Sequence, residues 1–119
     1  MEEITMNEEF VKNIYKTIIE DGKIMYKDLY DNTEVTKRTT DYYKNALELY
    51  HSLSDSQKNV FMDVIEQTMI DTVSHIFGIF DGSSTLSGNS MEFDVKINGV
   101  STENELQDYF LDFVENHNN

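Results

Sequence analysis

Apolar residues recur every three or four positions along most of this 119-residue chain, the spacing that puts them on one face of an α-helix. The pattern predicts a helix from Asn7 to Gly22 and a shorter helix over residues 23–30, packed at an angle to the first. A polar loop is expected over residues 31–40. Further helices are expected over residues 41–53 and 55–80, with a last one opening after Thr102.

Two of these helix starts carry a capping box, a Ser or Thr followed three residues later by Glu or Gln: Ser54 with Gln57, and Thr102 with Glu105. From residue 55 to residue 80 the apolar positions cover about 240° of the helix circumference. The core-facing stripe of a surface helix needs only about 100°. We therefore expect this helix to be central and to be covered on several sides.

A period of two replaces the helical period near the C-terminus, which is typical of a strand with one buried face. Its apolar members are Met91, Phe93, Val95 and Ile97. Asn98-Gly99 follows as a signal for a tight hairpin turn. The expected fold is a single α+β domain over residues 1–119, mostly helical, with a long central helix, helices packed on it and a small antiparallel hairpin near the C-terminus.

The net charge is the part of the composition that says most about possible partners. Acidic residues outnumber basic ones, 23 against 9, for a formal net charge of −14. Residues 61–119 hold 11 acids and a single base, Lys96, and so carry −10 of this charge. Such a surface repels nucleic acid and anionic membranes, so we expect neither as a direct partner and favour a basic protein.

The chain has no cysteine, which excludes disulfides, thiolate nucleophiles and zinc–thiolate sites. Its first residues, Met1-Glu2-Glu3-Ile4, are acidic where a secretory signal is basic. No apolar run reaches the length of about 18 residues that a membrane span needs. The sequence therefore predicts a cytoplasmic protein.

The last predicted helix has an acidic face opposite its apolar stripe. Four carboxylates fall within about 80° of one another at 100° per residue, with no Lys or Arg on that helix: Glu105, Asp108, Asp112 and Glu115. We interpret this face as a docking surface for a cationic partner, extended by Glu92 and Asp94 of the strand. The alternative is an ordinary solvated face that aids solubility.

Other candidates for chemistry are weaker. Asp71 and His75, spaced i, i+4, could hold a metal, but two ligands do not make a site and we expect only a hydrogen bond between them. The Asp81-Gly82 turn lacks the later ligands of a calcium loop. No phosphate-binding loop, dinucleotide fingerprint or nucleophile elbow is present in the sequence. We therefore expect neither an enzyme nor a bound metal or cofactor.

Tyrosines gather in the region before the long helix, at Tyr26, Tyr30, Tyr42, Tyr43 and Tyr50. Tyrosine is enriched at protein interfaces, so this region is a second candidate contact surface. The alternative interpretation is packing in the core and at its rim, because several of these residues share a helical spacing.

The stretch from Asp71 to Asp112 resembles a pattern found in small, acidic bacterial proteins, some of which are similar to immunity proteins that protect a cell from a toxin. The residues that carry the resemblance are DTVSHIFGIFDG at 71–82, the strand over 93–97 and ELQDYF at 105–110. The resemblance implies a bacterial origin, and no site residue is transferred from it.

The leading hypothesis is a non-enzymatic immunity or inhibitor protein that occludes a basic surface of a toxin, such as the active site of a nuclease. A phage or plasmid inhibitor that mimics DNA has nearly the same charge signature, although a mimic needs its acids in two extended rows. A third possibility is a structural or oligomerising domain that uses Tyr42 and Tyr43, with charge serving solubility alone.

Overall fold

The computed structural model describes residues 5–88 and 91–117. Its helical elements are α1 (Met6–Ile14), the π-helical segment η1 (Tyr15–Glu20), α2 (Asp21–Asn32), α3 (Asp41–Ser52), α4 (Asp55–Asp81) and α5 (Leu106–His117). Two short antiparallel strands lie between α4 and α5, β1 (Lys96–Ile97) and β2 (Val100–Ser101). The predicted α+β, mostly helical fold with a small hairpin near the C-terminus is confirmed.

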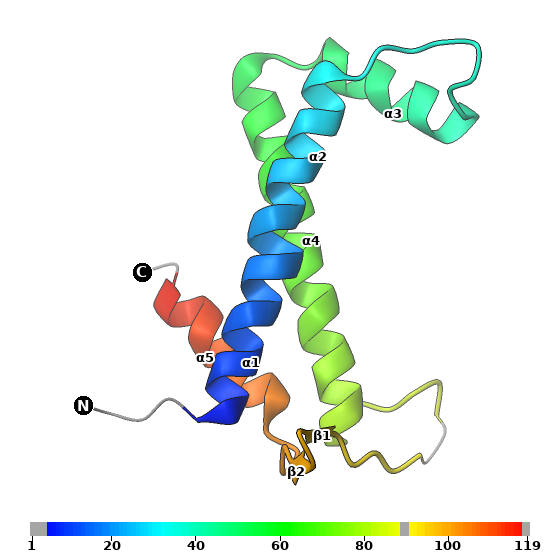
Figure 1. Ribbon diagram of the computed structural model, residues 1–119. Helices are drawn as coiled ribbons and strands as arrows, with labels where there is room; N and C mark the ends of the chain where they lie inside the picture. Colours follow the sequence, from blue (N-terminus) through cyan, green and yellow to red (C-terminus); the bar gives the residue numbers. More distant parts are fainter. Residues whose placement is uncertain (1–4, 89–90, 118–119) are drawn as a thin grey trace.

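The first helical segments form one continuous rod, α1–η1–α2, which lies antiparallel beside α4 (Figure 1). The predicted break at Gly22 and the second helix at an angle are therefore wrong. A Cβ atom at Gly22 would lie 3.2 Å from the sulfur of Met69 on α4, so this glycine lets the two long helices approach closely. The first cap is Thr5, whose hydroxyl accepts a hydrogen bond from the amide of Glu8, while Asn7 donates to the Thr102 carbonyl instead.

The ends of α4 follow the sequence signals. Ser54 and Gln57 form both hydrogen bonds of the predicted capping box. At the other end Gly82 adopts φ +84°, the left-handed conformation that terminates a helix. Between these caps α4 runs for 27 residues and contributes side chains to both parts of the core.

The core consists of two clusters, one towards each end of the long helices. The first joins the rod, α4 and α5 through Val11, Tyr15, Ile19, Ile70, Phe77, Leu106 and Phe110. The second joins α2, α3 and α4 through Tyr30, Leu47 and Tyr50, with Phe61 and Ile65 packed beside them. Because α4 meets the rod along one side and α5 near its end, Val60, Val64 and Ile76 stay exposed. Other helices thus cover less of the α4 circumference than predicted.

Only the last part of the predicted strand pairs in a sheet. Phe93 and Val95 do turn inward, the ring of Phe93 lying 5.6 Å from that of Phe80, but Met91 is exposed. The hairpin turn is confirmed, with Asn98 and Gly99 at φ +52° and +81°. Ladder pairing ends after Ser101 because the chain turns away towards α5.

The predicted capping box at Thr102 is not the start of α5. Thr102 is buried, and Glu103 and Asn104 adopt left-handed backbone angles, so the helix begins only at Leu106. The amide of Gln107 in its first turn donates to a carboxylate oxygen of Asp81, 2.7 Å away at the end of α4. Asp81 of α4 therefore supplies the hydrogen-bond acceptor for the first turn of α5, the role that the sequence pattern assigned to Thr102.

Candidate functional site

The acidic candidates lie on α5, whose position is held from its opposite side. Leu106 and Phe110 are fully buried in the first core cluster, with the Phe110 ring 5.5 Å from that of Phe77. The Gln107 side chain donates to the Ser74 carbonyl over 3.0 Å and accepts from the Ser83 hydroxyl over 2.7 Å. These contacts hold α5 against α4 and so fix which of its faces points outward.

Asp108, Asp112 and Glu115 lie on this outward face and Glu105 lies directly before α5. All four predicted carboxylates are exposed. We call this set the α5 acidic face. Glu105, Asp108 and Asp112 line one shallow depression of about 280 Å³ together with Tyr109. Within residues 5–88 and 91–117, no ion pair with Lys, Arg or His involves any of the four. The face can therefore attract a cationic group from another molecule.

A groove of about 430 Å³ borders this face where α5 packs on α1. Asp112 lies on its α5 wall, and Glu8 and Lys12 lie on its α1 wall. Tyr109 and Phe113 provide its apolar surface. These α1 residues were not predicted to belong to the site, because about 100 positions separate them from α5 and no local pattern reports such a contact.

The two strand candidates do not join the face. Asp94 accepts a hydrogen bond from the Ser101 hydroxyl at 2.9 Å and lies 3.8 Å from the ammonium of Lys96, so its charge is partly balanced within the hairpin. Glu92 is exposed and lines a different hollow, beside the end of α4.

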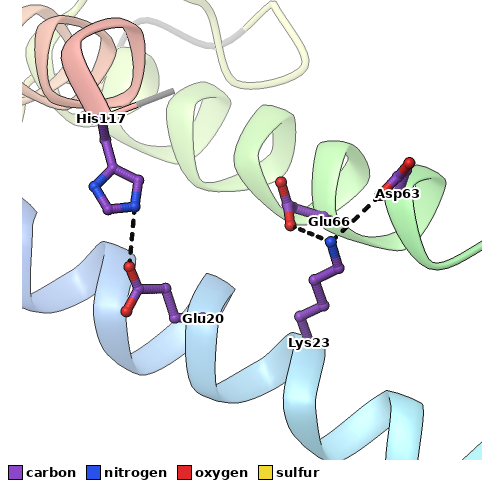
Figure 2. A network of polar contacts seen from close by, with 5 residues as sticks. All are labelled: Glu20, Lys23, Asp63, Glu66 and His117. Carbon is purple, nitrogen blue, oxygen red and sulfur yellow. Dashed lines mark hydrogen bonds and ion pairs between the residues drawn. The ribbon is translucent and has the colours of Figure 1, made fainter. Parts of the chain in front are cut away.

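A second polar group ties α5 and α4 to the rod (Figure 2). His117 at the end of α5 lies 3.1 Å from a carboxylate oxygen of Glu20, and its ring stacks on Phe113 at 5.3 Å. The Lys23 ammonium lies 2.7 Å from Glu66 and 3.3 Å from Asp63, and its hydrogen bond with Glu66 is the main cause that raises the pKa of Lys23. These pairs join separate helices and serve to hold the fold.

Among the described residues, the predicted hydrogen bond between Asp71 and His75 does not form. Asp71 instead accepts a hydrogen bond from the side-chain amide of Gln67 at 2.9 Å. His75 is exposed beside it. In the described part of the chain, no group of three or more His, Asp or Glu side chains converges as a metal site would require.

The predicted tyrosine cluster divides into two. Tyr30 and Tyr50 are core residues, with ring centroids 5.4 Å apart and both rings about 5 Å from Phe61. Tyr42 and Tyr43 are exposed on α3, in edge contact with each other at 5.0 Å. Tyr26 is partly buried against the same core cluster as Tyr30 and Tyr50, so Tyr42 and Tyr43 are the members of the set most accessible to a partner.

Three comparisons with known proteins, against family models, curated proteins and solved structures, gave no match. The resemblance to immunity-like proteins therefore stays a prediction. Among the helices of the described ranges, none has the length and apolar character needed to cross a membrane.

Proposed function

We propose that this protein is a non-enzymatic, acidic protein-binding module that acts in the cytoplasm as an immunity or inhibitor protein. Its α5 acidic face occupies a basic surface of a toxin, such as the phosphate-binding site of a nuclease. The observation that carries the proposal is the set of four exposed carboxylates on one helix face, without an ion-pair partner among residues 5–88 and 91–117.

The energetics support a contact role. Like charges three or four positions apart on a helix destabilise it by roughly 0.2–0.5 kcal/mol per pair. Lys and Arg side chains of a partner reverse this repulsion and form charge-assisted hydrogen bonds with the carboxylates. Because Leu106, Phe110 and Gln107 already hold α5 in place, little ordering entropy is lost on binding.

The DNA-mimic alternative needs acids in two extended rows, like phosphates. The four carboxylates of α5 form a single row, and on the neighbouring α1 wall Glu8 is followed one turn later by Lys12. A base at that position interrupts a second row. This arrangement favours a compact basic site over the long groove of a nucleic-acid-binding enzyme.

The test starts by capturing partners from the native host on the immobilised protein and then titrating the purified partner by calorimetry. We expect Asp108→Lys with Asp112→Lys to weaken its binding by about 100-fold, because both attractions become repulsions. Binding also weakens at about 0.5 M salt, where the Debye length falls to about 4 Å.

The matched control is Glu34→Lys with Glu48→Lys, which changes the net charge by the same amount at exposed positions away from α5. We expect this variant to bind within about threefold of the native chain, since the remaining effect is long-range and screened. A partner whose affinity is insensitive to the α5 substitutions and to salt contradicts the proposal.

A further inference from the structure

A second surface, free of charge and rich in apolar side chains, spans α3 and α4. On α3, Tyr42 and Leu49 are two turns apart on one face and are 69% and 55% exposed. On α4, Val60 and Val64 are one turn apart and are 60% and 58% exposed. We call the following set the α3–α4 apolar surface: Tyr42, Leu49, Leu53, Val60, Phe61 and Val64.

This surface is continuous where the two helices meet. Leu49, Leu53, Val60 and Phe61 line one groove of about 310 Å³, with Gln57 as the only polar side chain in its wall. Four other hollows on the described surface each have at least one carboxylate in their lining. Contiguous exposed apolar surface of this kind marks an interaction site in a soluble chain.

Within this surface Phe61 also packs beside the second core cluster, whereas Tyr42, Leu49, Val60 and Val64 are mostly exposed. The opposite side of α3 carries Leu47 and Tyr50 into the second core cluster against Tyr30. Figure 1 shows α3 projecting sideways from the end of the rod and α4, opposite the end where α5 and the hairpin lie. The apolar side chains on the outer face of α3 are therefore not part of the second core cluster.

Charge indicates what can cover the surface. Residues 26–60, which include α3 and the start of α4, hold six acids and five bases, a net charge of −1, whereas the rest of the chain carries −13. A basic partner finds little net negative charge here. A second copy of this chain meets its least repulsive region, and α5 lies at the opposite end of the long helices from α3 (Figure 1).

The chain is also more extended than a compact domain of its length. The Cα radius of gyration is 17.9 Å and the molecule extends 48 × 41 × 23 Å. A compact domain of this length has a radius of gyration of about 13.5 Å. We propose that the protein forms a symmetric dimer in which the α3–α4 apolar surface of one copy packs on the same surface of the other.

Analytical ultracentrifugation of the full chain over about 1–500 μM tests the dimer, a range that covers weak and tight association. We expect the mass to rise from 13.9 kDa towards twice that value. Leu49→Glu with Val60→Glu raises the dimer dissociation constant by about 100-fold or more, because each carboxylate enters the interface twice. Ile24→Glu, at an apolar residue on α2 with 69% exposure, is the matched control and keeps the dimer.

The salt response separates this proposal from the proposed function. Dimerisation strengthens as salt screens the repulsion between two chains of charge −14, whereas binding of a basic partner weakens. Far-ultraviolet circular dichroism checks that Leu49→Glu with Val60→Glu stays folded. The proposed dimer is overturned if the native chain keeps a mass of 13.9 kDa at every concentration. It is also overturned if dimers persist after this double substitution, or if a different protein covers the α3–α4 apolar surface.

Discussion

Tyr50 combines burial, aromatic packing and a charged neighbour in one side chain. Its ring lies within about 5 Å of two core aromatics and 5.2 Å below the ammonium of Lys58, and its hydroxyl donates to Asp31. Burial, followed by the hydrogen bond and charge of Asp31, raises the pKa of Tyr50 to about 12. The Lys27 ammonium, 2.6 Å away, and then the Tyr50 hydroxyl hold the pKa of Asp31 below its ordinary value.

This side chain gives a testable pH dependence. The folded state holds the phenol proton of Tyr50 more tightly than the unfolded chain, so its contribution to stability is complete below pH 10 and is lost as pH rises towards about 12. Absorbance titration at about 295 nm should show a late tyrosine component that Tyr50→Phe removes. Asp31→Asn should bring the pKa of this component only part of the way back towards its ordinary value, because burial is the larger cause of the raised pKa. An unchanged titration in Tyr50→Phe contradicts the assignment.

At the scale of elements, the contact between α4 and α5 depends on a glycine and a glutamine. A Cβ atom at Gly78 would lie 2.8 Å from the Gln107 amide nitrogen, which donates to the Ser74 carbonyl. Gly78 thus leaves room on α4 for the Gln107 side chain of α5. Glycine inside a helix costs about 1 kcal/mol relative to alanine, and the hydrogen bonds of Gln107 offset part of that cost.

A double-mutant cycle measures this coupling. In the Gln107→Ala chain, Gly78→Ala should raise the free energy of unfolding by up to about 1 kcal/mol, because the obstructing amide is gone, the Ser84 hydroxyl 3.0 Å from the new Cβ can rotate aside, and helix propensity improves. In the native chain the same substitution should give no gain, since the added methyl group displaces Gln107 from Ser74. Urea unfolding of the four chains gives the coupling energy. Equal effects of Gly78→Ala in both backgrounds contradict the clash.

At the scale of the whole molecule, charge is unevenly distributed. The end with α3 carries the α3–α4 apolar surface in a nearly neutral stretch of chain, while the end with α5 carries the α5 acidic face. Between them, Lys23 joins the rod to α4 through Glu66, and His117 joins α5 to the rod through Glu20. The two proposed contacts therefore use opposite ends, and a dimer leaves both α5 acidic faces free.

The net charge predicts how stability responds to salt. At −14, repulsion within the folded chain exceeds that in the expanded unfolded chain, so screening favours folding. Raising sodium chloride from about 0.02 to about 0.5 M should increase the free energy of unfolding by roughly 1 kcal/mol, seen as a melting temperature higher by about 4 °C. The Asp108→Lys with Asp112→Lys chain, with a net charge of −10 in place of −14, should gain less. A melting temperature independent of salt in both chains contradicts this expectation.

Much of the fold follows from rules that act within one or two helical turns, and these parts could be predicted from sequence. The Ser54 capping box, the end of α4 at Gly82 and the Asn98-Gly99 turn each depend on the conformations open to a few adjacent residues. The position of the four acids on one face of α5 also follows from helical spacing alone.

Tertiary contacts decided the rest. Gly22 lies inside a continuous helix and packs closely against Met69 of α4, and Asp81 of another helix accepts a hydrogen bond from the Gln107 amide in the first turn of α5. The nearness of Glu8 and Lys12 to the acidic face, and the outward direction of Leu49 and Val60, depend on how separate helices pack. Sequence periodicity shows which side of a helix is apolar, but only packing against the other helices determines whether that side is covered.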